Sequence, residues 1–489
     1  MSATTRRLRL SLVLVAMGLA GCANFHGLHT EGTSLKAQNL QAGQSLAGIT
    51  LSPAAWPKRD WWTGLGDPQL DGLIKEALRD SPDMQVANAR THQAIAAAAA
   101  ADADRAPTLD ADASVQRARF NREQDPLGVG QAYSTTRNLE ATFSYNFDLW
   151  GGERAAWEAA LGQARAAEID GQAAALTLAA DVARAYSNLA QAYIVADLAQ
   201  EDLKRTGQML TLGQRRHTAG VDSDYQLQQT ESLQATSQGQ AINAEKQLAS
   251  ARIALAVLLG KGPDRAYEVA RPKVLQPGVV QLPSVLPAEL LGRRPDLVAA
   301  RWRVEAASKD IVAGKARFYP NLNLSAAAGV QSILGDALFG GPSRFWNIAP
   351  TVSLPIFDGG RLRANLDARD ADYDLAVAQY NKSLVKALGD VSDSIVQVRA
   401  LNRQVDAAQH AADVAQRSYD SVSQRYGAGI GSYVDVLTIE QQLLQAQQQL
   451  ASLNAERIDQ SIQLMQALGG GFQDEQLALA PSATATPTE

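Results

Sequence analysis

Residues 139–149 read LEATFSYNFDL, and apolar and polar side chains alternate along the whole stretch. A period of two places the apolar side chains on one face of a β-strand and the polar ones on the other. Such a strand is typical of the wall of a membrane barrel, but a soluble sheet with one solvated face gives the same pattern. Residues 346–356 repeat the alternation, and residues 109–120 and 319–330 are expected to form partner strands.

These strands belong to two copies of one longer unit. Landmarks of the first half recur in the same order 209 to 213 residues later: Pro82 and Pro295, Pro107 and Pro320, Phe147-Asp148 and Phe357-Asp358, Ala219-Gly220 and Ala428-Gly429, Leu259-Gly260 and Leu468-Gly469. A period near 210 is a whole structural unit and is far longer than a solenoid repeat. We therefore expect an internal duplication.

Long helices fill most of each half. No proline occurs between Pro126 and Pro263, or between Pro355 and Pro481, which favours uninterrupted helices, the first at about 153–216. Apolar residues in both proline-free stretches recur in steps of three and four, as in the narrow seam of a coiled coil. One such seam is Leu388, Val391, Ile395 and Val398. The expected fold is mainly α with a small β part, and each half is a short helix, two strands, a very long helix and a long helix.

Composition excludes several classes of protein. Among 489 residues there are 45 Lys and Arg against 51 Asp and Glu, a net charge of -6, which does not suit a nucleic-acid groove. One cysteine excludes an internal disulfide, and five histidines in no HExxH arrangement give no zinc site. No nucleophile–base pair or paired carboxylates stand out, so we expect neither an enzyme nor a metal site.

The N-terminus reads as an export signal. Three arginines precede an apolar run at 10–20 that is too short to cross a bilayer. The run ends in LAGC at 19–22, which looks like the lipobox of a bacterial lipoprotein, so Cys22 is the predicted site of a diacylglycerol and an N-acyl chain. Ala23 favours the outer membrane as the destination. An ordinary signal peptide with a chance cysteine is the alternative.

The chain divides into six predicted segments. They are a signal peptide at 1–21, a lipid-anchored linker at 22–66, a first repeat at 67–262, a proline-rich connector at 263–293, a second repeat at 294–471 and a disordered tail at 472–489. Four strands cannot close a barrel, and an open sheet edge cannot lie in lipid. Either the strands lie outside a membrane, or several chains share one barrel.

Five motifs resemble the TolC-like outer-membrane factor family of multidrug efflux, in its NodT/OprM-type lipoprotein branch. They are WWTGLGDP at 61–68, LGRRPDL at 291–297, FYPNL at 318–322, PIFDGGR at 355–361, and RYGAG at 425–429 with DVL at 435–437. WRVEAA at 302–307 is similar to the branch that serves fusaric-acid-type or major-facilitator exporters. The resemblance covers about residues 56–470.

The resemblance implies a homotrimer whose 12-stranded outer-membrane β-barrel continues into a 12-helix periplasmic α-barrel. It implies a passive exit channel, anchored by lipid in the outer membrane with a periplasmic extension. Its partners would be a periplasmic adaptor and an inner-membrane pump of the resistance-nodulation-division or major-facilitator type. The alternative is a lipid-anchored coiled-coil scaffold or adhesin in the periplasm, which leaves the alternating strands unexplained.

The resemblance also implies two functional regions. Asp435 would form a ring of carboxylates at a periplasmic gate, with Tyr426 beside it, although Thr438 stands where the family often has a second carboxylate. The tips of the two helix hairpins would contact the adaptor through Ala219, Gly220, Ala428 and Gly429. Turn formation alone would also require these glycines, and Asp435 has an alternative as an ordinary solvated helix residue.

Overall fold

The computed structural model describes residues 27–36, 56–119, 134–273, 275–276, 292–332 and 338–474. Cys22 and the predicted signal peptide 1–21 lie outside these residues, as do parts of the predicted linker, connector and tail. The chain forms two compact units. The strand unit comprises Met1–Ser34, Thr91–Ala167 and Ala300–Tyr380, and the tip unit comprises Leu35–Arg90, Glu168–Ala299 and Asn381–Glu489.

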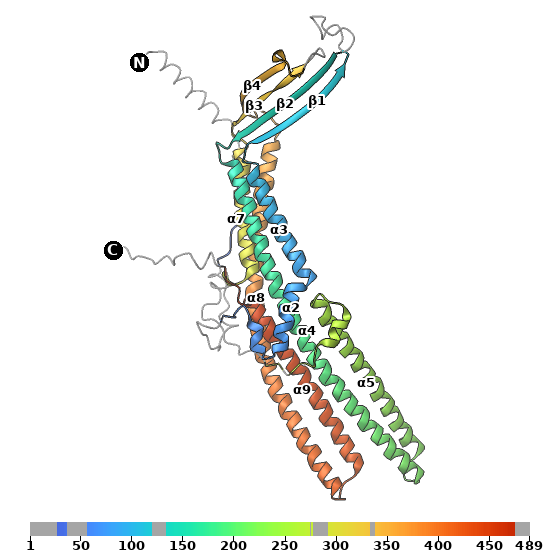
Figure 1. Ribbon diagram of the computed structural model, residues 1–489. Coiled ribbons are helices and arrows are strands. Elements are labelled where there is room, and N and C mark those ends of the chain that lie inside the picture. The colour runs from blue at the N-terminus through green and yellow to red at the C-terminus, as the bar shows by residue number, and fades with distance from the viewer. Residues whose placement is uncertain are drawn as a thin grey trace, which may run out of the picture. The chain divides into compact units, whose positions relative to one another are not determined.

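The duplication is visible helix by helix (Figure 1). The paired helices are α3 (Pro82–Ala103) with α7 (Pro295–Ala316), α4 (Gly152–Thr218) with α8 (Arg361–Gly427), and α5 (Asp224–Leu258) with α9 (Tyr433–Ala467). Within each pair the lengths are identical, at 22, 67 and 35 residues. The first half adds α2 (Pro68–Asp80), which begins where the Asp67 side chain accepts a hydrogen bond from the Gln69 amide. Among the described residues, no helix is long and apolar enough to cross a bilayer.

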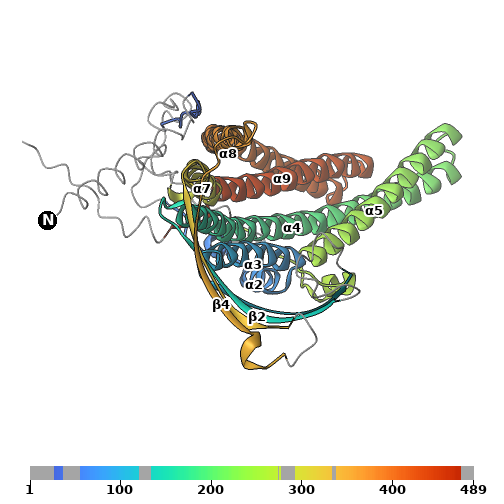
Figure 2. The same cartoon turned by 90° about the horizontal axis from the view of Figure 1, so that it is seen from above.

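The strands form one antiparallel sheet in the order β1-β2-β3-β4, which curves into an arc (Figure 2). Their bounds are Thr108–Ala118, Ser134–Phe147, Asn321–Ser332 and Arg344–Ser353. The predicted strand at 346–356 therefore ends three residues early, before Pro355, which has no amide hydrogen for the ladder. The expected partners at 109–120 and 319–330 differ by one or two residues at each end.

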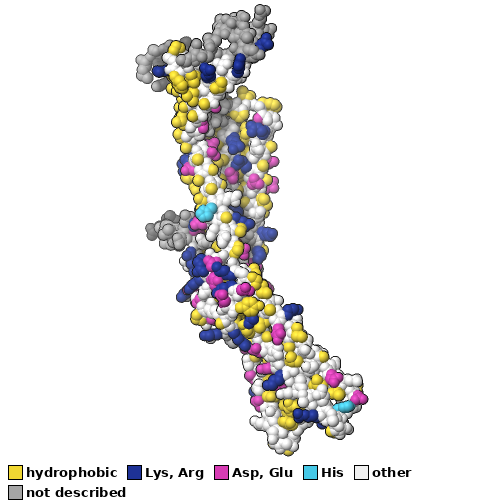
Figure 3. All heavy atoms as spheres, turned by 45° about the vertical axis from the view of Figure 1, so that its right-hand side comes forward, with side chains coloured by type: hydrophobic (Ala, Val, Ile, Leu, Met, Phe, Trp, Pro, Cys, Tyr) yellow, Lys and Arg dark blue, Asp and Glu magenta, His cyan; other side chains and the backbone are white. Residues whose placement is uncertain are grey.

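The two faces of the sheet differ in chemistry. Over most of its length one face pairs apolar residues across all four strands, as in Leu109 and Phe143, Leu139 and Val330, Tyr145 and Leu324, Ala326 and Ile348. Arg117, Arg137 and Arg344 lie on the same face at one end of the sheet. The other face pairs polar residues: Asp112 with Glu140, Asn138 with Gln331, Asn323 with Thr351. The alternation in the sequence thus becomes one apolar and one polar surface. Hydrophobic side chains gather over the strands at the upper end of Figure 3.

Helices of the strand unit approach closely at glycines. A Cβ on Gly152 would stand 2.7 Å from the Ala316 Cβ, and one on Gly162 would stand 3.0 Å from that of Ala306. These small residues let α4 lie against α7. The same unit contains the buried cluster Ile311, Phe318 and Leu366, on which Leu28, Leu362 and Tyr373 pack.

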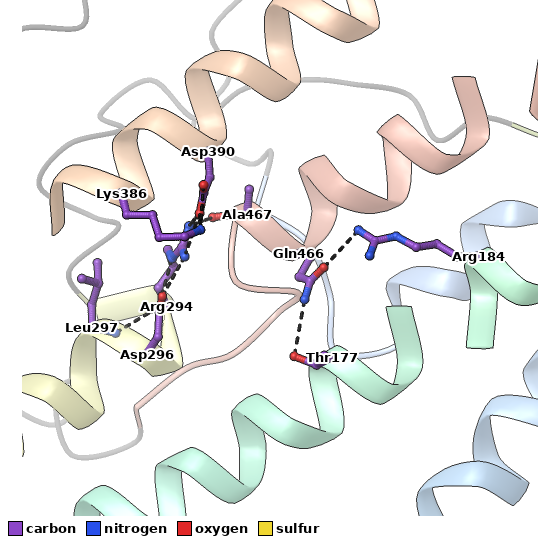
Figure 4. A network of polar contacts seen from close by, with 9 residues as sticks. All are labelled: Thr177, Arg184, Arg294, Asp296, Leu297, Lys386, Asp390, Gln466 and Ala467. Atoms are coloured by element: carbon purple, nitrogen blue, oxygen red, sulfur yellow. Dashed lines mark hydrogen bonds and ion pairs between the residues drawn. The ribbon is translucent and has the colours of Figure 1, made fainter. Parts of the chain in front are cut away.

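The tip unit contains a buried arginine from the LGRRPDL motif. Arg294 Nη1 donates to the carbonyl of Ala467 in the last turn of α9 at 3.2 Å, and its Nε and Nη2 hold Asp296 at 3.0 and 2.7 Å (Figure 4). Asp390 of α8 lies 3.4 Å from the same guanidinium. The motif therefore ties α7, α8 and α9 together. It is structural here.

Candidate functional site

The first helix hairpin turns at Gly220, between α4 and α5. Gly220 has a φ of 73°, its amide donates to the His217 carbonyl at 2.9 Å, and the Val221 amide donates to the Arg216 carbonyl at 2.9 Å. This pair of bonds is a Schellman motif, which needs a left-handed residue. Ser223 then starts α5 with a capping box.

The second hairpin turns in the same way between α8 and α9. Gly429 has a φ of 76°, its amide donates to the Tyr426 carbonyl at 2.9 Å, and the Ile430 amide donates to Arg425 at 3.0 Å. Ser432 caps α9. Ala219, Gly220, Ala428 and Gly429 are all exposed, and a Cβ on either glycine would meet nothing within 4 Å. Turn geometry accounts for the glycines, and the turns leave the tips open to a partner.

The two tips present different chemistry. On the first, Arg216 forms two contacts of 2.9 Å with Asp222, and His217 Nε2 lies 2.7 Å from Asp224. The Arg216 guanidinium holds the pKa of Asp222 below its usual range. On the second, the rings of Tyr426 and Tyr433 lie 5.0 Å apart, and Ile430 is 68% exposed. The first tip is ionic and the second is aromatic and apolar.

Asp435 lies in the first turn of α9 and is exposed, whereas the next two residues, Val436 and Leu437, are buried. The structure places the Tyr426 ring against Tyr433. The Tyr433 hydroxyl donates to Gln208 Oε1 of α4 at 3.1 Å, and burial raises the pKa of this hydroxyl. A tyrosine that the sequence analysis missed thus connects the predicted gate segment to the neighbouring hairpin.

A polar cluster centred on the buried Arg205 contacts α9 two residues after Asp435. Arg205 of α4 is 1% exposed on its side chain, and its Nη1 donates to the Leu437 carbonyl of α9 at 3.1 Å. Its Nε and Nη2 contact Asp202 Oδ1 at 3.1 and 2.6 Å, and Ser237 of α5 donates to Asp202 Oδ2 at 2.6 Å. One guanidinium therefore connects three helices of the tip unit, two residues away from Asp435.

Glu440 extends the cluster along α9. Burial raises the pKa of its carboxyl, and the nearby Glu201 carboxylate raises it further, while Arg205 opposes the shift. A cavity of about 370 Å³ lies beside the cluster, lined by Asp202, Arg205 and Ser237 together with several glutamines. In the described part of the chain, no three His, Cys, Asp or Glu side chains converge as metal ligands would. These contacts stabilise the packing of α4, α5 and α9 and place the charged groups of Arg205 and Asp202 between them.

Comparison with known proteins gives concordant matches. The family model described as "Outer membrane efflux protein" matches residues 73–261 and 286–470. The chain is 36% identical over 379 residues to the fusaric acid resistance protein FusA of Burkholderia cepacia. That alignment covers 76% of this chain and 70% of FusA. It is 32% identical over 479 residues to the pyoverdine export outer membrane protein OpmQ of Pseudomonas aeruginosa, covering 96% and 98% of the two chains.

A solved structure shares the fold. The outer membrane protein VceC of Vibrio cholerae superposes with a TM-score of 0.76 at 33% sequence identity, over 86% of this chain and 100% of that one.

Proposed function

The chain belongs to the outer membrane efflux protein family, and on this premise we propose that three copies form the exit duct of a tripartite efflux system. The duct passively conducts drugs or other small toxic compounds from a periplasmic adaptor and an inner-membrane pump to the outside. Because the pump supplies the energy, the chain needs no catalytic residue and no cofactor. The names of FusA and OpmQ suggest small organic cargo, and either pump type fits.

The curved sheet is the observation that carries this proposal. Its apolar face is exposed on the edge strands, where Leu109 is 73% and Trp346 is 76% exposed, and half-buried on the central strands. Such a surface is costly in water and suits lipid. On its other face Asp112 lies opposite Glu140, and two carboxylates at that separation require water or counter-ions. Lipid outside and water inside is the environment of a channel wall.

The same observation disfavours the rival function. A periplasmic scaffold or adhesin would account for the coiled-coil helices and for an acylated Cys22. It would leave an apolar sheet face in water, and it would not explain why both repeats carry a strand pair. The channel accounts for both features.

The gate belongs to the proposal as well. Three copies would bring three Asp435 side chains round one axis at the periplasmic end, where facing carboxylates favour cations and oppose bulky anions. Tyr426 would act through Tyr433 and its hydrogen bond to Gln208. The open tips at Ala219-Gly220 and Ala428-Gly429 would receive the adaptor, and acyl chains on Cys22 would hold the assembly in the outer membrane.

Planar-bilayer recording of the purified chain tests the proposal. We expect discrete channels that prefer cations, and we expect Asp435→Ala to raise the conductance and weaken that preference. Asp420→Ala, which removes an exposed carboxylate from α8, is the matched control and should leave both quantities unchanged. Protein that never conducts, even as Asp435→Ala, would favour the scaffold. Identical records for Asp435→Ala and the wild type would remove Asp435 from the gate.

A further inference from the structure

A second cavity of the tip unit lies between α4 and α9. It has a volume of about 470 Å³ and is bordered on a third side by the segment 271–275, which follows the short helix η3 (Pro263–Glu268). A volume of this size is in the range of small-molecule sites. None of its described lining residues belongs to the predicted gate or to the two tips, so the proposed channel gives this cavity no role.

Two polar contacts join α4 to α9, one on each side of the cavity. Arg184 Nε lies 3.1 Å from Asp459 Oδ1. Arg205 donates to the Leu437 carbonyl. The described residues of α4 and α9 that line the cavity fall between these two contacts in both helices. A molecule in the cavity would therefore touch both helices midway between their existing links.

The walls that the two helices contribute are apolar, and several of the side chains are small. Ala190, Ala451 and Ala455 line the cavity. The larger apolar residues of the lining are Ile194, Leu198, Leu450 and Ile458. Alanines on facing helices leave a space that larger side chains would fill, and apolar cavities are poor sites for water but accept apolar ligands. An occupant of this cavity therefore needs an apolar body.

The charged part of the lining is cationic. Arg271, Lys273 and Arg457 line the cavity, and its described lining residues include no Asp or Glu. Arg271 is held in place by Asp197 and by the Tyr193 ring, whose centroid lies 5.2 Å from the guanidinium carbon. An apolar space with a positively charged border complements an anion that has an apolar body.

Arg457 interrupts the apolar pattern of α9. It follows Leu453 by four residues and precedes Leu464 by seven, so it takes a position in the helix seam. The starts of α5 and α9 are 209 residues apart, and the same offset carries Arg457 to Leu248, which packs against a buried apolar cluster. Arg457 Nη2 donates to Asn454 at 2.9 Å, but its Nε is buried with no hydrogen-bond partner among the described residues. A buried donor without an acceptor is costly, and a bound anion would supply the acceptor.

We propose that this cavity binds an amphiphile with one carboxylate and an apolar chain, the chemistry of a free fatty acid. The carboxylate accepts a hydrogen bond from Arg457 and pairs with Lys273, while the chain lies against the apolar walls of α4 and α9. Such a ligand bridges the two helices between their polar contacts and holds α9 more firmly on α4. This binding goes beyond the proposed channel and does not depend on it.

Photoaffinity labelling of the intact protein tests the site. The probe is decanoic acid that carries a diazirine in its chain, and mass spectrometry locates the labelled peptides. We expect label on residues 187–198 of α4 and 447–458 of α9. Decanoate should displace the probe, whereas decanol, which has the same chain without the charge, should not. Label that decanol displaces as well as decanoate, or label only on other peptides, would overturn the proposal.

Substitutions separate recognition of the charge from occupation of the space, and circular dichroism checks that each variant keeps its helices. Arg457→Leu introduces the leucine that the first repeat has at this position, and it should weaken binding of the probe about 10- to 150-fold because a charge-assisted hydrogen bond is lost. Ala451→Phe fills the cavity and should abolish labelling. Lys273→Gln should weaken binding, whereas its matched control Lys246→Gln, which removes an exposed cation of α5 outside the lining, should not. Undiminished labelling of Arg457→Leu would overturn the proposal, whether or not the chain conducts in a bilayer.

Discussion

Replacing Arg205 with methionine removes a charge from the interior of the tip unit while keeping a long side chain. In the native chain Arg205 Nη1 donates to the Leu437 carbonyl at 3.1 Å, and the guanidinium neutralises Asp202. The variant loses the bond from α4 to α9 and leaves Asp202 with the Ser237 hydroxyl. We therefore expect the first turns of α9, which carry Asp435, to open more often.

The size of the effect follows from the one bond that crosses to α9. A hydrogen bond from a charged donor contributes about 1.5–3 kcal/mol. Since about 1.4 kcal/mol is a factor of ten in an equilibrium constant, amides of α9 near Val436 should exchange with deuterium about 10- to 150-fold faster in Arg205→Met. The assay is native-state hydrogen exchange of the intact protein in detergent.

Two further variants make the result specific. Arg216→Met, in the same helix as Arg205, breaks the pair with Asp222 of the following turn and should leave exchange in α9 unchanged. The double variant Arg205→Met with Asp202→Asn should lower the free energy of unfolding by less than the sum of the two single variants. The expected difference is about 0.5–3 kcal/mol, because the double variant leaves no carboxylate without its guanidinium partner. Unchanged exchange in Arg205→Met, or equal acceleration in Arg216→Met, would refute this reasoning.

Three other outcomes are expected. Cys22→Ser should abolish incorporation of labelled palmitate, and incorporation into that variant would exclude Cys22 as the anchor. Gly220→Val together with Gly429→Val places side chains at positive φ on both tips, and it should abolish drug export while leaving the oligomer intact; normal resistance would show that the tips do not dock an adaptor. Burial raises the pKa of Glu440, so the folded state binds this proton more tightly and stability falls as pH rises from the ordinary value of the carboxyl through the raised one. Glu440→Gln should remove this pH dependence of the stability, and the variant should unfold at a higher temperature than the wild type at pH 7. Identical pH profiles of stability for the two proteins would show that Glu440 is not the titrating group.

Sequence periodicity anticipated most of the fold because it is a local property. The absence of proline and the three-and-four spacing predicted a helix at about 153–216, and the structure has Gly152–Thr218. Alternation located the strands, but it could not locate the end of β4 at Ser353. Ser144 faces the first residue of β1 and Ser353 faces the first residue of β3, and these two serines are 209 residues apart. Phe147 and Phe357 are 210 residues apart, so the second repeat has one extra residue near Pro355.

The sequence could not predict the cluster around Arg205, because the contacts that bury it are distant in the chain. Asp202 and Arg205 are three residues apart on one helix, a spacing that usually marks an exposed surface pair. What buries the pair is its packing against Ser237 and Leu437, which are 35 and 232 residues away in the chain. Tyr433 was missed similarly, since its partner Gln208 is 225 residues distant. At the tips the turns themselves were predictable, because Gly220 and Gly429 supply the positive φ that each turn needs. The contact of these tips with an adaptor stays a prediction.

The number of chains in the detergent-solubilised complex tests the whole account most directly. Four strands with two open edges should leave a lone chain unable to line a pore, so native mass spectrometry of the intact protein should find three copies. A complex that contains one chain, in a preparation that retains its helices, would contradict the account.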